Sequence, residues 1–381
     1  MTIPALVTIL MTSSFILDAV ANPHPLAAWL RLTLTPGLGP SSQRQLLAAF
    51  GLPERIYEAG HSAIAAVIGG PMARTLLDHD ATAAVDAALD WQAQPGNAVL
   101  TLGDVAYPAA LLEIPDPPVV LYVKGDPALL ARQSVAVVGA RNATPQGEAN
   151  AEAFSAALSQ AGLTIVSGLA LGIDGAAHRG GLAGPGSTVA VIGTGADRIY
   201  PARNAALARR IAEAGAIVSE FPLGTAPLAH NFPRRNRLIA GLACGVLVVE
   251  AALKSGSLIT ARLAIDCGRE VFAIPGSIHS PVARGCHQLI RDGAKLVEAA
   301  SDILEELRLA PREAAPVPDL ATPEPVGDEG RVVAALGHDP VDIDTLVRRT
   351  SLTPEALYAI LLALELDGRV SRLPGGRLQR L

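Results

Sequence analysis

The sequence predicts an α/β protein: a Rossmann-like parallel sheet domain, preceded by a small helical domain and followed by a winged helix. Through the middle of the chain, short apolar runs alternate with segments of helical periodicity. Glycine and other small residues follow most of these runs. Such alternation produces βαβ units and a parallel sheet that helices cover on both faces. The expected strands are residues 134–138, 163–166, 188–192, 216–219, 245–250, 270–274 and 295–297.

Composition fits a globular protein with more than one domain. The chain has 381 residues, and half of them are apolar, which allows two or three domains. Three cysteines without paired spacing indicate a reduced compartment, and we expect a cytoplasmic protein without a membrane span. The chain has a net charge of −6, and residues 301–330, with eight acids and two arginines, alone have a net charge of −6. A basic surface elsewhere is therefore compatible with the acidic total.

The N-terminal part divides into an extension and a helical domain. Residues 1–25 lack a basic n-region, so we expect a disordered extension, or a start codon placed too far upstream, instead of a signal peptide. Residues 26–95 have helical periodicity, with helices expected near 54–57, 62–68 and 82–91 and Ser41 as an N-cap. The turn Gly37-Leu38-Gly39 resembles the hairpin of helix-hairpin-helix modules, whose amides receive phosphates. A plain helix–helix turn is the commoner explanation.

The remaining boundaries follow from proline content and periodicity. Residues 96–308 form the expected sheet domain, in which the short strands of 98–130 are a lead-in that packs on the sheet edge. Residues 309–327 are a proline-rich linker. Residues 328–381 suggest three helices, one capped by Thr353, and two strands around a Gly375-Gly376 wing. This winged-helix plan has nearly balanced charge, which leaves protein contact and DNA binding equally open.

Candidate binding residues lie at the carboxyl ends of the expected strands, where open α/β sheets bind ligands. Glycines let the backbone approach a phosphate, helix N-termini offer N–H groups, and arginines add bidentate charge. Any one segment has a purely structural explanation, but their expected convergence on one rim favours binding. The candidates are Gly139, Arg141, Ser167, Gly168, Arg203, Asn204, Asn231, Phe232, Arg234, Arg235, Asn236, Arg237, Lys254, Ser255 and Gly256, with Ser257 as an expected N-cap.

Motifs for catalysis, cofactors and metals are not apparent in the sequence. Neither a complete dinucleotide fingerprint nor a Walker motif is found. Asp174 and His178 are four residues apart and could pair, although a helix-opening aspartate beside a satisfied histidine is the commoner explanation. Cys286-His287 lacks two further ligands at suitable spacing. We therefore expect no catalytic residue, no cofactor and no metal.

Six segments resemble the DNA-processing protein family DprA/Smf over roughly residues 95–300. They are residues 139–147, 167–174, 193–201, 219–222, 231–241 and 255–261. Four residues depart from the family pattern: Ala140 replaces the usual serine, Leu171 a frequent arginine, and Cys286-His287 a typical Thr-Asn pair. The Leu171 change removes one possible phosphate contact.

The resemblance implies a non-enzymatic protein. Members of this family bind single-stranded DNA, protect incoming strands during natural transformation and load RecA in place of the single-strand binding protein. RecA, the single-strand binding protein and a second copy of the chain are then the expected partners. The resemblance makes Arg141 the DNA-contacting arginine, with further contacts expected from Arg203 and residues 234–237. Aromatic residues are only 3% of the chain, so binding should depend mainly on phosphates.

Two other function classes are alternatives to a DNA-binding mediator. One is a nucleotide or nucleoside-phosphate hydrolase of the lysine-decarboxylase-like Rossmann group, whose Pro-Gly-Gly-x-Gly-Thr pattern is not matched by Pro275-Gly276-Ser277. The other is a winged-helix regulator with a ligand-sensing sheet domain. Deleting residues 328–381 separates the regulator from the mediator, because only the regulator should then lose DNA binding.

Overall fold

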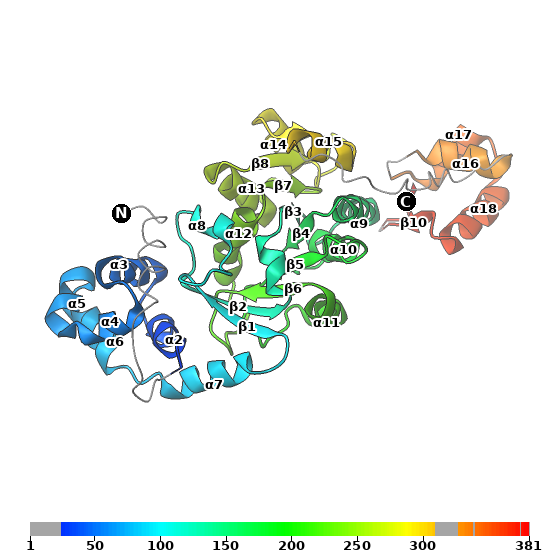
Figure 1. The fold of residues 1–381 in the computed structure, drawn as a ribbon. Coiled ribbons are helices and arrows are strands. Elements are labelled where there is room, and N and C mark those ends of the chain that lie inside the picture. The colour runs from blue at the N-terminus through cyan, green and yellow to red at the C-terminus, as the bar shows by residue number, and fades with distance from the viewer. Residues whose placement is uncertain (1–23, 309–326, 338–339, 374, 381) are drawn as a thin grey trace.

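The computed structural model describes residues 24–308, 327–337, 340–373 and 375–380. Almost all of the expected extension (1–25) and linker (309–327) lies outside the described residues. Within the described residues, a sheet of nine strands has the order β1-β2-β6-β5-β4-β3-β7-β8-β9 (Figure 1). Its strands are β1 (Asn97–Thr101), β2 (Val120–Gly125), β3 (Ser134–Val138), β4 (Thr164–Ser167), β5 (Thr188–Val191), β6 (Ala216–Ser219), β7 (Gly245–Val248), β8 (Glu270–Ala273) and β9 (Lys295–Leu296).

The predicted parallel sheet is confirmed. Strands β3 to β9 pair in parallel, and every residue of β3, β4, β5, β6 and β7 is buried. Full burial explains why these strands are continuous apolar runs. The helices between them are α9 (Pro145–Gln160), α10 (Ile173–Gly181), α11 (Ala205–Ala214), α12 (Asn231–Leu242), α13 (Gly256–Asp266) and α14 (Arg284–Arg291), and α15 (Ala300–Glu306) follows β9.

The chain changes direction across the sheet between β3 and β7. From β3 it moves outward through β4 and β5 to β6, and α12 then returns it to β7 on the other side of β3. The loops after β3 and β7 therefore diverge and leave a crevice beyond their carboxyl ends. In sheets of this kind, that crevice is where ligands bind.

The lead-in strands extend the sheet. β1 and β2 form an antiparallel pair, and β2 pairs antiparallel with β6. Between them, α8 (Ala109–Leu112) precedes a proline-rich turn, which the Tyr107 hydroxyl fixes by donating to the Pro118 carbonyl at 2.7 Å. The expected lead-in at the sheet edge is thus a continuation of the hydrogen-bonded ladder, and it carries the sheet toward the N-terminal helices.

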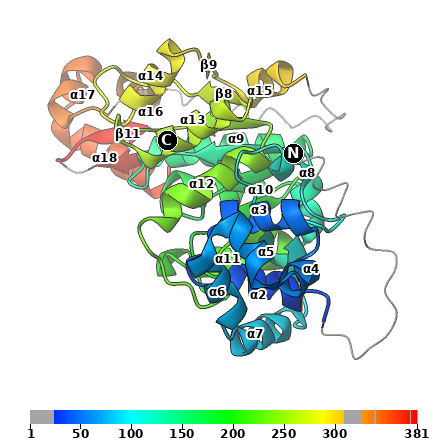
Figure 2. The same cartoon turned by 90° about the vertical axis from the view of Figure 1, so that its left-hand side faces the viewer.

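The N-terminal helices pack against this end of the sheet domain. They are α2 (Ala27–Leu34), α3 (Pro40–Phe50), α4 (Pro53–Glu58), α5 (Gly60–Ile68), α6 (Gly70–Asp78) and α7 (Thr82–Gln92). Their buried residues share one hydrophobic core with β1 and β2, and Figure 2 shows them in front of the sheet domain. The prediction of Ser41 as N-cap is wrong, because α3 begins at Pro40 after Gly39. α6 is not among the helices expected from the sequence.

The C-terminal winged helix has its own core. It consists of α16 (Asp328–Leu336), α17 (Ile343–Thr350), α18 (Pro354–Leu366) and the antiparallel strands β10 (Val370–Arg372) and β11 (Leu378–Arg380). Thr353 caps α18 as predicted, accepting from the Ala356 N–H.

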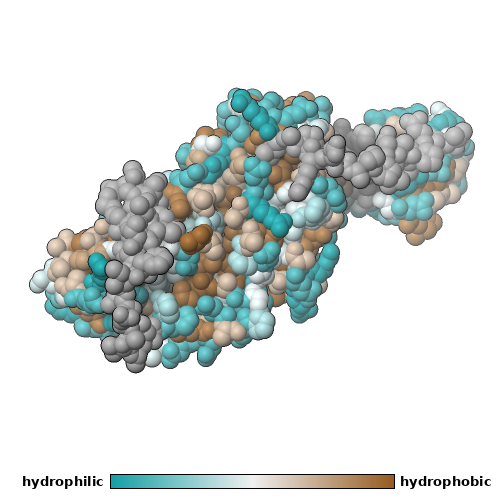
Figure 3. All heavy atoms as spheres, in the orientation of Figure 1, coloured by the Kyte–Doolittle hydropathy of each residue, from teal (hydrophilic) through white to brown (hydrophobic). Residues whose placement is uncertain are grey.

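Figure 3 shows hydrophobic and hydrophilic residues mixed over one face of the molecule, with hydrophobic residues gathered on its central part. None of the helices in the described ranges has the length and hydrophobicity that a membrane span requires.

Candidate functional site

A cavity of about 350 Å³ lies at the switch point, outside the carboxyl ends of β3 and β7. Four segments supply its walls: the loop after β3, the loop after β4 with the start of α10, α12 and the start of α13. Of the predicted site residues, it brings together Gly139, Arg141, Phe232, Arg235, Asn236, Ser255 and Gly256. Four residues outside the predicted set also line the cavity: Ala170, Pro233, Ile239 and Thr260.

The loop after β3 is held in place by its neighbours. A Cβ on Gly139 would lie 2.6 Å from the Ile173 side chain, so only glycine fits the close approach of this loop to α10. Farther along, the half-buried Glu250, two residues after β7, has a carboxylate that accepts from the Thr144 N–H at 2.9 Å and from its hydroxyl at 2.6 Å. The backbone on both sides of Arg141 is therefore fixed, while the Arg141 side chain is exposed.

Arg141 and two aromatic rings form the mouth of the cavity. The Arg141 guanidinium lies 5.6 Å from the centroid of the Phe232 ring, within cation–π range. The Tyr200 ring also lies beside Phe232, with ring centroids 5.6 Å apart. Phe232 is half-buried and Tyr200 is exposed. The mouth thus offers a positive charge and aromatic surface together.

Two buried charged side chains, Arg235 and Asp174, form the floor. Arg235 is 4% exposed, and its Nη1 donates to the Val191 carbonyl at 2.6 Å. A Cβ on Gly168 would lie 1.8 Å from that nitrogen, so the glycine makes room for the guanidinium. Burial lowers the pKa of Arg235 to about 10, which still leaves it protonated at neutral pH. Burial raises the pKa of Asp174, and the Arg235 charge opposes this rise.

Asp174 and His178 do not form the pair that their spacing allows. The Asp174 carboxylate accepts from the Ala170 N–H at 3.3 Å. His178 Nε2 accepts from the Leu169 N–H at 3.2 Å, so Nδ1 carries the proton and lies 2.7 Å from Thr188 Oγ1. Burial lowers the pKa of His178 to about 3, so this histidine is neutral near pH 7. The commoner interpretation of the motif, a satisfied structural histidine, agrees with the structure.

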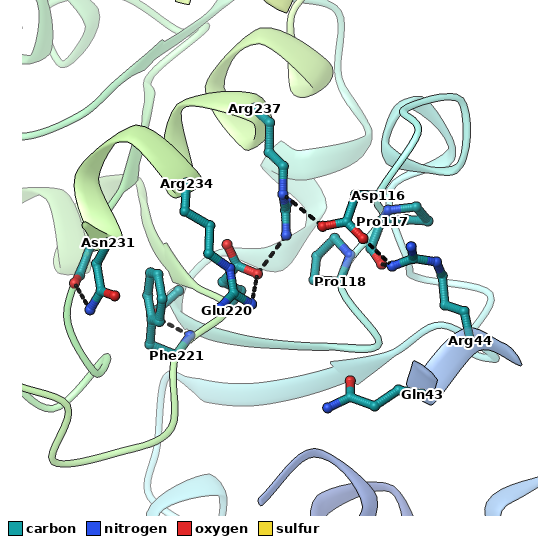
Figure 4. Close-up of polar contacts among 12 residues, drawn as sticks. Gln43, Arg44, Asp116, Pro117, Pro118, Glu220, Phe221, Asn231, Arg234 and Arg237 are labelled. Atoms are coloured by element: carbon teal, nitrogen blue, oxygen red, sulfur yellow. Dashed lines mark hydrogen bonds and ion pairs between the residues drawn. The ribbon is translucent and has the colours of Figure 1, made fainter. Parts of the chain in front are cut away.

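The basic residues of α12 divide between two faces of the helix. Arg235 and Asn236 line the cavity, whereas Arg234 and Arg237 extend to the other side and bind Glu220 Oε2 at 3.0 and 2.6 Å (Figure 4). Residues three apart share a helix face, which explains the division. Arg234 and Arg237 therefore do not join the cavity that Arg141 borders.

An ion-pair network continues from Glu220 to the helical domain. Arg237 lies 3.4 Å from Asp116, whose other carboxylate oxygen lies 2.5 Å from Arg44 of α3 (Figure 4). Three arginines and two acids carry a net charge of +1 here. The network connects the sheet domain to the N-terminal helices at their junction.

Other predicted site residues have positioning contacts or face solvent. Asn204 donates to the carbonyls of Leu169 and Ala170 at 3.0 Å, and Asn231 donates to the Gly193 carbonyl at 3.1 Å. The buried Ser167 hydroxyl donates to the Val137 carbonyl at 2.6 Å.

Arg203 and Lys254 are exposed and do not line the cavity; Lys254 directly precedes its lining residue Ser255, and Arg203 follows β5 in the chain. The N-cap of α13 is Ser255, not Ser257, because the helix begins at Gly256 and the Ser255 hydroxyl accepts from the Ser257 N–H.

The site is suited to an anion. Its lining carries two cations, Arg141 and Arg235, against the single carboxylate of Asp174, and the N-terminus of α13 opens into it. Partly positive helix N-termini and arginines favour phosphate groups. Among the residues that the structure describes, no three His, Cys, Asp or Glu side chains are placed to hold a metal ion.

Comparisons with known proteins identify the family. The family described as DNA recombination-mediator protein A matches residues 98–308, and the DprA winged helix domain matches residues 314–376. Protein Smf of Escherichia coli is 43% identical over 309 residues, covering 78% of this chain and 81% of the relative. DNA processing protein DprA of Streptococcus pneumoniae is 48% identical over 217 residues, covering 57% and 76%.

Solved structures agree with these matches. The X-ray structure of Streptococcus pneumoniae DprA has a TM-score of 0.66 at 40% identity, covering 74% of this chain and 97% of that one. A Helicobacter pylori DNA processing protein A, described for its unique single-stranded DNA binding mode, has a TM-score of 0.51 at 32% identity, covering 56% and 95%. The two family matches cover the sheet domain and the winged helix. The chain is therefore a member of the DprA/Smf family of DNA-processing recombination mediators.

Proposed function

We propose that this protein is a non-enzymatic recombination mediator that binds single-stranded DNA in the switch-point cavity. The observation that carries the proposal is the placement of Arg141: exposed, on a fixed loop, above Phe232 and at the entrance to the cavity. The Helicobacter pylori relative, described for its single-stranded DNA binding mode, supports the choice of ligand.

An unpaired strand fits this site better than a duplex. A cavity of about 350 Å³ admits a phosphate or one nucleotide but excludes the width of a double helix. Phe232 and Tyr200 offer ring faces to an unstacked base, and stacking tolerates any sequence. Arg141, Arg203 and Lys254 are exposed on the cavity's side and contact the sugar-phosphate chain.

The mediator activity follows from strand binding. Bound to incoming DNA in the cytoplasm during natural transformation, a homodimer protects the strand and loads RecA in place of the single-strand binding protein. Adding the protein to a strand coated with single-strand binding protein should raise RecA-dependent ATP hydrolysis. An unchanged rate would contradict the loading step while leaving strand binding intact.

The hydrolase alternative has less support. Asp174 is buried and accepts from the Ala170 N–H, and His178 is buried and hydrogen-bonded on both ring nitrogens. Neither side chain is free to activate water.

Binding should distinguish single from double strands and depend on salt. With about three phosphates neutralised per protomer, log affinity for a single strand should fall with log salt at a slope of about −2. Mobility shifts of matched single- and double-stranded oligonucleotides over a salt series measure both properties. Equal affinity for the duplex, or a slope near zero, would contradict phosphate-led binding of an unpaired strand.

A further inference from the structure

α18 of the winged helix presents a row of exposed hydrophobic side chains. Tyr358, Leu362 and Leu366 are 48%, 56% and 80% exposed, and they follow one another at intervals of four residues. Side chains at this spacing share a helix face, so the three form a continuous row about 12 Å long. Three buried leucines on another face attach α18 to the core of its own domain. A single exposed leucine is ordinary on a protein surface, whereas a contiguous apolar patch marks an interaction site.

The sheet domain does not cover this row. It is the wing of the domain that faces the sheet: Leu373 and Arg377, on either side of Gly375-Gly376, line a cavity of about 780 Å³ together with Ser277 and Ser280 of the loop after β8. None of the three side chains of the row lines that cavity. The row is therefore accessible to a partner while the wing lies against the sheet domain.

The charge of α18 disfavours DNA as the ligand of the row. In a helix-turn-helix the second helix enters the major groove, and here that helix is α18, which follows α17. Binding a duplex requires arginine or lysine to neutralise its phosphates. α18 contains neither, and its two charged residues are Glu355 and Glu365. The same composition disfavours a membrane surface, because interfacial helices are rich in lysine and arginine.

The two carboxylates flank the row at its ends. Glu355 lies three residues before Tyr358, and Glu365 lies three residues after Leu362, so both belong to the exposed side of the helix. Glu355 is exposed, and Glu365 lies 3.3 Å from Arg372 of β10. The surface thus has an apolar centre and an acidic group at either end.

A second copy of the chain does not complement this arrangement. Two α18 helices packed in parallel would bring Glu355 beside Glu355, and two packed antiparallel would bring Glu355 beside Glu365. Like charges that meet across an interface disfavour it, whereas opposite charges select the partner. A partner with basic residues at these places complements both ends of the row.

We propose that the exposed row of α18 binds an amphipathic helix of a partner protein, apolar along one side and flanked there by lysine or arginine. Helices pack side by side through rows of this kind, and the basic residues pair with Glu355 and Glu365. The inference goes beyond strand binding. It gives the winged helix a protein-binding role, while the strand stays at the switch-point cavity.

The test measures the binding of a labelled amphipathic peptide of leucine and lysine to the full chain by fluorescence anisotropy. Leu362→Glu should weaken this binding about tenfold, because it removes the centre of the apolar row. Ile265→Glu is the matched control, since Ile265 is also on a helix, α13, is 55% exposed and does not line the first cavity. Its affinity for the peptide should equal that of the wild type. General attraction between a basic peptide and an acidic chain predicts the opposite result, tighter binding by both variants.

Circular dichroism checks that both variants are folded, and four results would overturn the inference. The first is unchanged or tighter peptide binding by Leu362→Glu. The second is equal binding of a peptide of leucine and glutamate, which would exclude a basic partner. The third is a smaller species of Leu362→Glu in sedimentation, which would assign the row to a second copy of the chain. The fourth is weaker oligo-dT binding by Leu362→Glu, which would assign α18 to the DNA surface. Failure of the wild-type chain to bind oligo-dT overturns the proposed function instead, and the peptide measurement does not depend on it.

Discussion

Replacing Arg141 by alanine should weaken single-strand binding about 10- to 100-fold and leave the fold unchanged. The guanidinium is exposed above Phe232, and no carboxylate of the described residues lies within ion-pair distance of it. Its removal therefore leaves no buried partner unpaired. Anisotropy with oligo-dT measures the affinity, and circular dichroism checks the fold.

Arg132→Ala is the matched control for this substitution. Arg132 is also exposed, but it precedes β3 and so lies at the amino ends of the strands, opposite the cavity. The Arg132→Ala substitution removes the same charge as Arg141→Ala, but from the opposite end of the strands. Equal losses in the two variants would indicate that net charge alone governs binding. Unchanged affinity of Arg141→Ala would exclude the cavity mouth as the contact.

Replacing Glu220 by alanine should destabilise the junction with the N-terminal helices by about 3–5 kcal/mol. The Glu220 carboxylate lies 2.6 Å from Arg237, and these side chains are only 2% and 13% exposed. Without the carboxylate, the Arg237 charge stays buried with only the more distant Asp116, at 3.4 Å. Removing one partner of a buried ion pair destabilises the folded state far more than replacing both partners by apolar residues does.

An exposed ion pair with the same N–O distance provides the control for Glu220→Ala. Glu113 also lies 2.6 Å from an arginine, Arg269, but is 64% exposed, so Glu113→Ala should cost at most about 1 kcal/mol. Both tryptophans, Trp29 and Trp91, lie in the N-terminal helices, so urea unfolding followed by tryptophan fluorescence reports on this region. Equal losses in the two variants would mean that the network does not hold the junction.

The sequence was most informative about the sheet. Buried strands of four or five residues appear as short apolar runs, so the predicted ranges agree with β3 to β8 to within two residues at either end. Helix starts were harder to locate, because Ser255 and Ser257 are both good caps and only the backbone decides between them. α6 was not expected because Gly70 and Pro71, which open it, also mark loops.

The candidate site was predicted in part. Strand order brings Gly139, Arg141 and Ser255 together, and the rule for parallel sheets anticipates this. The four polar residues that follow Pro233 were grouped as one basic segment, although helical spacing already puts Arg234 and Arg237 on one face and Arg235 on another. What spacing does not reveal is the contact on each face: the Val191 carbonyl for Arg235, and the Glu220 carboxylate for the other two arginines.

The most direct measurement of the central claim is a photocrosslink between the strand and the cavity mouth. An oligonucleotide containing 5-iodouracil, irradiated in complex with the full chain, should crosslink to peptides that contain Phe232 or Tyr200, the two rings beside Arg141. The Arg141→Ala variant should give little of either product. Crosslinks confined to the winged helix, or to the amino ends of the strands near Arg132, would contradict the assignment of the switch-point cavity as the DNA site.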